Sequence, residues 1–135
     1  MTLQAALLTL ANDARAQTGL PSLRMNPLLL QIAQNHAATM AGEGYFDHID
    51  TQGRGVGERL LAAGYNYRWA GENISAGKQF AAEVMQWWLT SESHRANLFK
   101  AEFTETGFGY CYIEHDRLSF HHYWVQVFAA PLAVA

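Results

Sequence analysis

Two histidines and one glutamate stand out because they lie in loops or beside helix ends, where a side chain can face a cleft. His48 follows "GYFD", Glu72 lies in "AGENI", and His94 stands within "WWLTSESHRANLF". Two imidazoles and a carboxylate are the usual set for a zinc site with an open position, and also for acid–base catalysis. Their wide separations in sequence match no compact metal motif. Histidines at helix ends also often bond only the last carbonyls of the helix, and this alternative stays open.

Other polar residues are candidates with simpler structural interpretations. His36 lies on an apolar helical stripe, which favours a core histidine bonded to backbone. His121, at a strand end, is either exposed or at the mouth of a cleft. Arg95 could grip an anionic ligand in bidentate fashion, or could pin a loop. Ser91 can share a helical face with His94, but the sequence shows no oxyanion donors, so serine hydrolysis is not favoured.

The elements that must position these residues follow from capping and periodicity. Thr2 predicts a helix N-cap, and Asn26 followed by Pro27 predicts another. Helices first and a β-hairpin last indicate one α+β domain over residues 1–135. We expect helices over about 2–17, 26–42, 58–64 and 80–89, a loop over 66–77, and strands over 106–114 and 120–129.

Composition narrows the functional classes. Half of the 135 residues are hydrophobic, and the net charge is −3 with scattered Lys and Arg. No basic stripe indicates nucleic-acid binding, and no apolar run is long enough to predict a transmembrane helix. The single cysteine, Cys111, excludes an internal disulfide. The first 16 residues lack the basic start of a signal peptide, so we expect none in this chain.

The sequence resembles the family of cysteine-rich secretory, antigen 5 and pathogenesis-related proteins (the CAP or SCP-like superfamily), and especially its short bacterial branch. The resemblance covers roughly residues 5–129, and its motifs keep the family's order. They are "AQNHAATMA", "YFDHID", "ERLLAAGY", "AGENISAG", "WWLTSESHRANLF", "TETGFGY" and "YWVQVFA".

The resemblance implies a three-layer α-β-α sandwich with a small antiparallel sheet and one large cleft. In eukaryotic members the cleft holds two His and two Glu, and the His pair can bind zinc. His48 and Glu72 match the first His and the Glu of the GEN motif. Ser91 and Tyr123 stand where the second Glu and the second His usually fall. We expect His94 to supply the missing imidazole, with Ser91, Tyr123 and Arg95 beside it in the cleft.

Three functions remain open at this level. The first is a secreted, non-enzymatic module, monomeric and extracellular or periplasmic, that binds a small molecule, lipid or peptide. It requires no cofactor, and zinc is the metal that His48 and His94 would hold. The second is a metal-assisted peptidase with Glu72 as general base. The third is a structural or protein-interaction domain whose cleft is vestigial.

Overall fold

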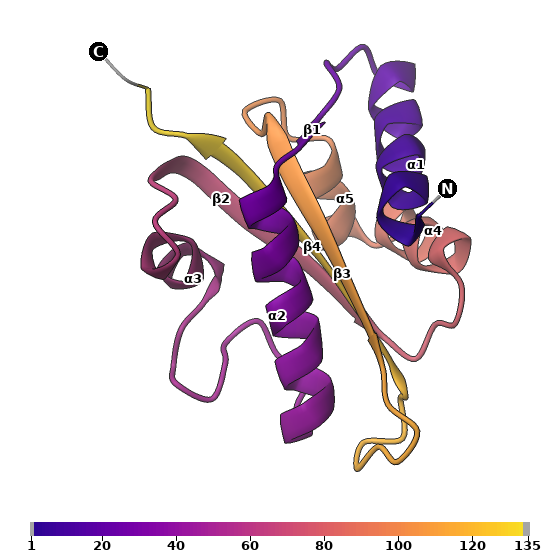
Figure 1. The fold of residues 1–135 in the computed structure, drawn as a ribbon. Coiled ribbons are helices and arrows are strands. Elements are labelled where there is room, and N and C mark those ends of the chain that lie inside the picture. The colour runs from indigo at the N-terminus through magenta and orange to yellow at the C-terminus, as the bar shows by residue number, and fades with distance from the viewer. Residues whose placement is uncertain (1, 134–135) are drawn as a thin grey trace.

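The computed structural model describes residues 2–133 as one sheet between two helical layers (Figure 1). The described helices are α1 (Leu3–Gln17), α2 (Pro27–Glu43), α3 (Val56–Ala62), α4 (Ala81–Thr90) and α5 (Glu92–Leu98). The strands are β1 (Arg24–Met25), β2 (Tyr67–Ala76), β3 (Glu105–Tyr112) and β4 (His122–Pro131). The predicted three-layer α+β architecture is confirmed.

The sheet has the order β1-β3-β4-β2, so β2 is an outer strand. The pair β3–β4 is the expected antiparallel hairpin, and the pair β2–β4, which was not predicted, is antiparallel as well. The two-residue strand β1 was not predicted, and it pairs in parallel with β3. The sheet is therefore antiparallel except at this short edge.

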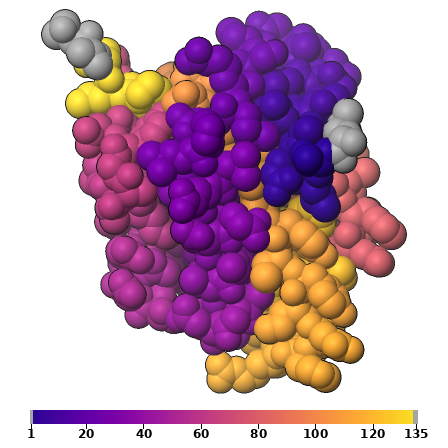
Figure 2. Space-filling view, in the orientation of Figure 1, coloured from indigo at the N-terminus to yellow at the C-terminus, as the bar shows by residue number. Residues whose placement is uncertain are grey.

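Each face of the sheet carries its own core. One core joins α2 and α3 to the face that presents Tyr123, Val125 and Val127. The other joins α1, α4 and α5 to the face that presents Trp124 and Phe128. Successive side chains of a strand point to opposite faces, so the sequence predicts Tyr123, Val125 and Val127 on one face of β4 and Trp124 and Phe128 on the other, as the two cores confirm. In the space-filling view, α2 covers the middle of the sheet (Figure 2).

The helix α2 packs directly on β3 because the strand lacks side chains at two positions. A Cβ on Gly107 would overlap the backbone of Leu29 and Leu30, and one on Gly109 would overlap Ala33. Such a close approach requires glycine. It fixes α2, and hence the loop that follows α2, relative to the sheet.

The two helix starts that have a capping residue were predicted correctly, whereas α3 begins two residues before its predicted start and α5 was not predicted. Thr2 caps α1 by accepting from the N–H of Ala5 at 3.0 Å, and Asn26 caps α2, as predicted. The helix α2 does not stop at Gly42. It continues through Glu43, and Gly44, with a φ of 75°, provides the left-handed C-cap.

The loop predicted over 66–77 is wrong, because most of it is the strand β2. The segment contains Gly71 and Asn73, which have low strand propensity. Pairing with β4 supplies the stability that local propensity lacks, since Gly71 faces Phe128 and Asn73 faces Gln126 in the register. Glu72 therefore lies on a strand rather than in a loop.

Candidate functional site

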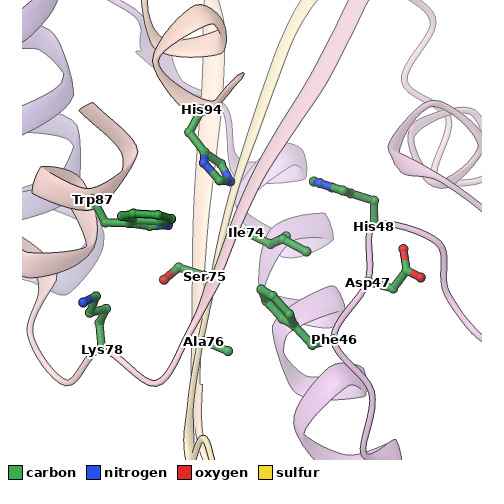
Figure 3. Close-up of a pocket in the computed structure, with 9 residues that line it drawn as sticks. All are labelled: Phe46, Asp47, His48, Ile74, Ser75, Ala76, Lys78, Trp87 and His94. Carbon is green, nitrogen blue, oxygen red and sulfur yellow. The ribbon is translucent and has the colours of Figure 1, made fainter. Parts of the chain in front are cut away.

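A cleft of about 550 Å³ lies between the two helical layers, along the outer strand β2 (Figure 3). One wall comes from the loop after α2 and carries Phe46, Asp47 and His48. The opposite wall carries Trp87 from α4, His94 from α5, and Lys78 from the turn before α4. The strand contributes the floor, which consists of Ile74, Ser75 and Ala76. The side chains of His48 and His94 point toward each other across the cleft (Figure 3).

His48 is held from behind by Glu72. Its Nδ1 lies 2.9 Å from Glu72 Oε1, and the backbone carbonyl of His48 accepts a hydrogen bond from Arg59 Nη2 at 2.9 Å. Because a carboxylate accepts, Nδ1 carries the hydrogen, and Nε2 is the ring atom left for the cleft. The side chain is 52% exposed. The hydrogen bond to Glu72 raises the pKa of His48 above its ordinary value.

Glu72 is buried behind His48 rather than in the cleft. Its side chain is 2% exposed, and Arg59 Nη2 lies 2.9 Å from Oε2 and 3.1 Å from Oε1. His36 Nε2 lies 3.9 Å from Oε1 and bonds the carbonyl of Asp47 at 2.9 Å. His36 is 2% exposed, so the predicted core histidine is confirmed. The expectation that Glu72 faces the cleft as a general base does not fit this geometry, because Glu72 is absent from the lining and both of its oxygens are engaged.

His94 lies inside the short helix α5 and is oriented by its own N-cap residue. Its Nδ1 lies 2.8 Å from Ser91 Oγ, so Ser91 makes no side-chain capping bond to the helix. The carbonyl of His94 accepts from Asn73 Nδ2 at 3.0 Å, which ties α5 to β2. Burial, with a smaller contribution from the nearby His48, lowers the pKa of His94. The two facing imidazoles therefore have pKa values shifted in opposite directions.

The remaining predicted cleft residues lie elsewhere. Tyr123 is buried on the α2 face of the sheet, and its hydroxyl donates to Asp116 Oδ2 at 2.6 Å. Arg95 is exposed on α5 and is not among the lining residues. Ser91 does not line the cleft; its hydroxyl is bonded to the His94 ring, which does. His121 bonds the carbonyl of Ile113 at 3.0 Å within the β3–β4 connection. Of the predicted cleft residues, only His48 and His94 line it.

Sequence reasoning missed Arg59, the cation beside Glu72. A buried carboxylate requires a cation or several donors, and the sequence alone suggests the histidine pair for this role. Arg59 stands next to Leu60 in α3, and both residues are buried. The sequence offered one signal for this contact: Arg59 is a charged residue on the buried stripe of the short helix α3, and such a residue needs a charged partner.

The apolar part of the lining was also missed, apart from one tryptophan. Adjacent helical residues point about 100° apart, so the sequence predicts that one of the two tryptophans fills the core and that the other lies toward the cleft or the surface. Trp88 is fully buried, and Trp87 is 46% exposed in the cleft. Phe46, opposite, is 40% exposed. These two aromatic rings make the cleft amphipathic.

The residues present fit a resident zinc ion poorly. His48 and His94 can offer two Nε2 ligands, but zinc sites in proteins use three or four protein ligands. Among residues 2–133, no group of three or more His, Cys, Asp or Glu is close enough to hold a metal ion. The predicted pair is thus at least one ligand short of a typical site.

Sequence comparisons connect this arrangement to known proteins. The model of the cysteine-rich secretory protein family (CAP) matches residues 8–128. The protein YkwD of Bacillus subtilis is 34% identical over 101 residues, covering 75% of this chain and 39% of the relative. The membrane protein YlbC of the same organism is 29% identical over 108 residues, covering 80% of this chain and 31% of the relative. The chain therefore spans about a third of the length of these relatives.

Solved structures share the fold. An extracellular protein containing an SCP domain from Bacillus anthracis superposes with a TM-score of 0.81 at 28% identity, over 93% of this chain and 39% of that one. An outer surface protein from Borrelia burgdorferi superposes with a TM-score of 0.85 at 17% identity, over 95% of this chain and 92% of that one. The second likeness concerns the fold alone.

No helix within residues 2–133 is both long and apolar enough to cross a membrane.

Proposed function

The chain belongs to the cysteine-rich secretory protein (CAP) family, and from that premise we propose that it is a non-enzymatic domain whose cleft binds a small amphipathic ligand. The observation that carries this proposal is the facing pair His48 and His94 beside the apolar side chains of Phe46, Ile74 and Trp87 in a cleft of about 550 Å³. This volume lies in the range of small-molecule sites, which are mostly apolar with a few placed polar groups. A lipid, a small organic molecule or a peptide fits this description.

The two imidazoles supply the polar recognition. With the hydrogen on Nδ1, neutral His48 offers an acceptor at Nε2, and its protonated form offers a donor with a positive charge. The raised pKa of His48 favours the protonated form, whereas the lowered pKa of His94 favours the neutral form. The pair therefore suits a ligand with one anionic or accepting group and one donating group. The rest of the ligand would lie against Phe46, Ile74 and Trp87.

Catalysis has weaker support. Ser91 lies 2.8 Å from His94 Nδ1, but it does not line the cleft, and the ring nitrogen facing the cleft is the other one. A hydroxyl placed behind its histidine cannot attack a substrate in the cleft. Glu72 is buried and pairs with both Arg59 and His48. Of these three residues, only His48 is exposed to a substrate in the cleft.

A metal-assisted hydrolase is the second candidate. It is favoured by the carboxylate behind His48, because such a partner commonly orients a metal-binding histidine. Chelator-sensitive cleavage of casein that disappears in His48→Ala and persists in His115→Ala, an exposed loop histidine, would support it. If His48→Ala destabilises the fold and no ligand of any class is found, the third interpretation, a structural domain with a vestigial cleft, replaces both.

The binding proposal is tested with two exposed tryptophans of β2 and α4. Trp87 lies in the cleft, whereas Trp69, 38% exposed, lies outside its lining. Sodium dodecanoate and a library of blocked hexapeptides are titrated into labelled protein while the His48, His94 and Trp87 ring signals are followed by NMR. We expect at least one probe to perturb these signals, and Trp87→Ala but not Trp69→Ala to weaken its binding. Cleft signals unmoved by every probe would overturn the proposal.

We also expect this domain to act outside the cytoplasm. The relative from Bacillus anthracis is described as an extracellular protein. Secretion assays on the full-length protein, with location followed by an antibody, test this expectation.

A further inference from the structure

The floor of the cleft is the edge of a strand rather than the face of a sheet. Ile74, Ser75 and Ala76 are consecutive residues, and all three line the cleft. Successive side chains of a strand point to opposite faces. A cavity over one face would therefore be lined by alternate residues only. The cleft instead runs along the outer edge of β2, which the strand order leaves without a neighbouring strand.

The hydrogen bonds of β2 show which backbone groups point outward. Gly77 N–H donates to the carbonyl of His122 at 2.8 Å, and Ser75 and Asn73 follow in the same register. In an antiparallel pair, alternate residues bond the partner strand and those between them point away. Ile74 and Ala76 therefore direct their N–H and C=O groups toward the cleft side.

Two side-chain contacts agree with this alternation. Trp88 Nε1 donates to the carbonyl of Ile74 at 3.2 Å, and Asn97 Nδ2 donates to the carbonyl of Glu72 at 3.1 Å. Both helices α4 and α5 thus satisfy outward carbonyls of β2. Among residues 2–133, no donor or acceptor contacts the N–H of Ile74, the N–H of Ala76 or the carbonyl of Ala76. These three main-chain groups along the floor are free to form hydrogen bonds with a ligand.

We propose that the ligand of the cleft is an extended peptide segment of another protein, which adds to β2 as a further strand. This inference rests on the proposed binding function and names its ligand class. Main-chain groups of a peptide match the free N–H of Ile74 and the free N–H and C=O of Ala76, as in other domains that bind peptides by strand addition. Exposed strand edges are normally blunted by charge, proline or a covering element. Here the edge lies at the bottom of a cleft with aromatic walls.

The two walls provide recognition of alternating peptide side chains. Residues of an added strand point alternately toward Phe46, Asp47 and His48 or toward the opposite wall. That opposite wall consists of Trp87, His94 and Lys78. Asp47 and Lys78 bear opposite charges, so a basic peptide side chain suits the position beside Asp47 and an acidic one suits the position beside Lys78, while Phe46 and Trp87 suit aromatic side chains. Three strand residues span roughly 10 Å, so the cleft engages a short segment.

The test follows the amide signals of β2 in labelled protein. The probes are a blocked hexapeptide library and the same library N-methylated at every residue, which removes the donors needed for strand pairing. We expect the ordinary library to shift the Ile74 and Ala76 amide protons downfield and to slow their exchange with solvent. The N-methylated library should leave both unchanged. Equal binding of the two libraries would overturn the proposal, as would peptide binding that leaves these two amides unmoved.

A pair of proline variants gives an independent check. Ala76→Pro removes an outward N–H in the cleft, whereas Ala70→Pro removes an outward N–H of the same strand outside its lining. Proline is tolerated on strand edges where its missing N–H faces outward, and melting curves check that both variants are folded. We expect about ten-fold weaker peptide binding in Ala76→Pro only. Equal losses in both variants contradict strand addition. Dodecanoate binding without peptide binding overturns this inference but leaves the proposed function standing.

Discussion

Nδ1 of His48 lies 2.9 Å from Oε1 of Glu72, and this contact joins an exposed cleft residue to a buried carboxylate. The carboxylate also pairs with Arg59. One buried group thus fixes both the ring orientation of His48 and the position of α3. The cleft wall that carries His48 therefore depends on two buried residues, Glu72 and Arg59, that do not line the cleft.

Glu72→Gln tests this network. The change removes the buried negative charge and leaves Arg59 without its counterion, so we expect the free energy of unfolding to fall by about 3 kcal/mol. The pKa of His48 should also fall, because the hydrogen bond that His48 donates to the charged carboxylate is what raises it. Urea unfolding and NMR titration of the His48 ring measure the two effects. Glu102→Gln, at an exposed position, is the matched control and should change neither.

The opposite pKa shifts of His48 and His94 predict opposite effects of pH on stability. The pKa of His48 is raised, so its contribution is present below the unfolded value near 6.5 and is lost as pH rises through the folded value. The pKa of His94 is lowered, so its unfavourable contribution grows as pH falls from about 6.5 through the folded value.

Urea unfolding at about pH 5.5 and about pH 8 separates the two histidines. Relative to the wild type, His48→Ala should lose more stability at the acidic pH. His94→Ala should lose less stability at the acidic pH than at the alkaline one. In the wild type, protonation of the His94 ring opposes folding at acidic pH, and the variant has no ring to protonate. If the loss of stability does not depend on pH in either variant, the cleft does not shift the pKa values of these two histidines.

The sequence was most informative where a local rule decides the structure. Thr2 and Asn26 marked helix starts because capping is a local hydrogen bond. The alternation of β4 assigned Tyr123 and Trp124 to opposite faces, since the period of a strand is two. The meeting of His48 with Glu72 was expected from motifs in the family's order rather than from spacing.

The sequence was least informative where distant segments decide. The strand β2 is formed by pairing with β4, and the hydroxyl of Tyr123 donates to Asp116 in the hairpin loop. The pairing of Arg59 with Glu72 depends on where α3 packs. None of these contacts has a signature in the local sequence, because each is formed between segments that periodicity alone cannot align.

The glycines of β3 give a packing prediction. Gly109→Ala would drive a Cβ into the backbone of Ala33 in α2, and backbone cannot rotate away as a side chain can. We expect a loss of about 2 kcal/mol in the free energy of unfolding. Gly42→Ala is the control, because it lies in α2 with no atom within 4 Å of the added Cβ. It should instead stabilise the helix by about 0.5 kcal/mol, and urea unfolding of both variants checks the contrast.

Zinc binding should depend on both cleft histidines. Two imidazoles without a third ligand predict weak binding by isothermal calorimetry. His94→Ala and His48→Ala should each abolish it, whereas His115→Ala, in the exposed hairpin loop, should not. Affinity should fall as pH drops through about 6.5, because a protonated imidazole cannot bind metal. Zinc binding unchanged in His94→Ala would refute the idea that His94 supplies the second imidazole.

Ser91→Glu tests whether the cleft lacks only one carboxylate. The Ser91 hydroxyl lies 2.8 Å from His94 Nδ1, so a glutamate at this position would place a negative charge beside the ring. The nearby charge should raise the pKa of His94 by favouring its protonated form, and a carboxylate near two imidazoles should tighten zinc binding. NMR titration of His94 and calorimetry with zinc measure these effects. Ser93→Glu adds the same charge to an exposed position of α5 and should do neither. Equal effects of the two variants would mean that net charge, rather than the position beside His94, controls the ring.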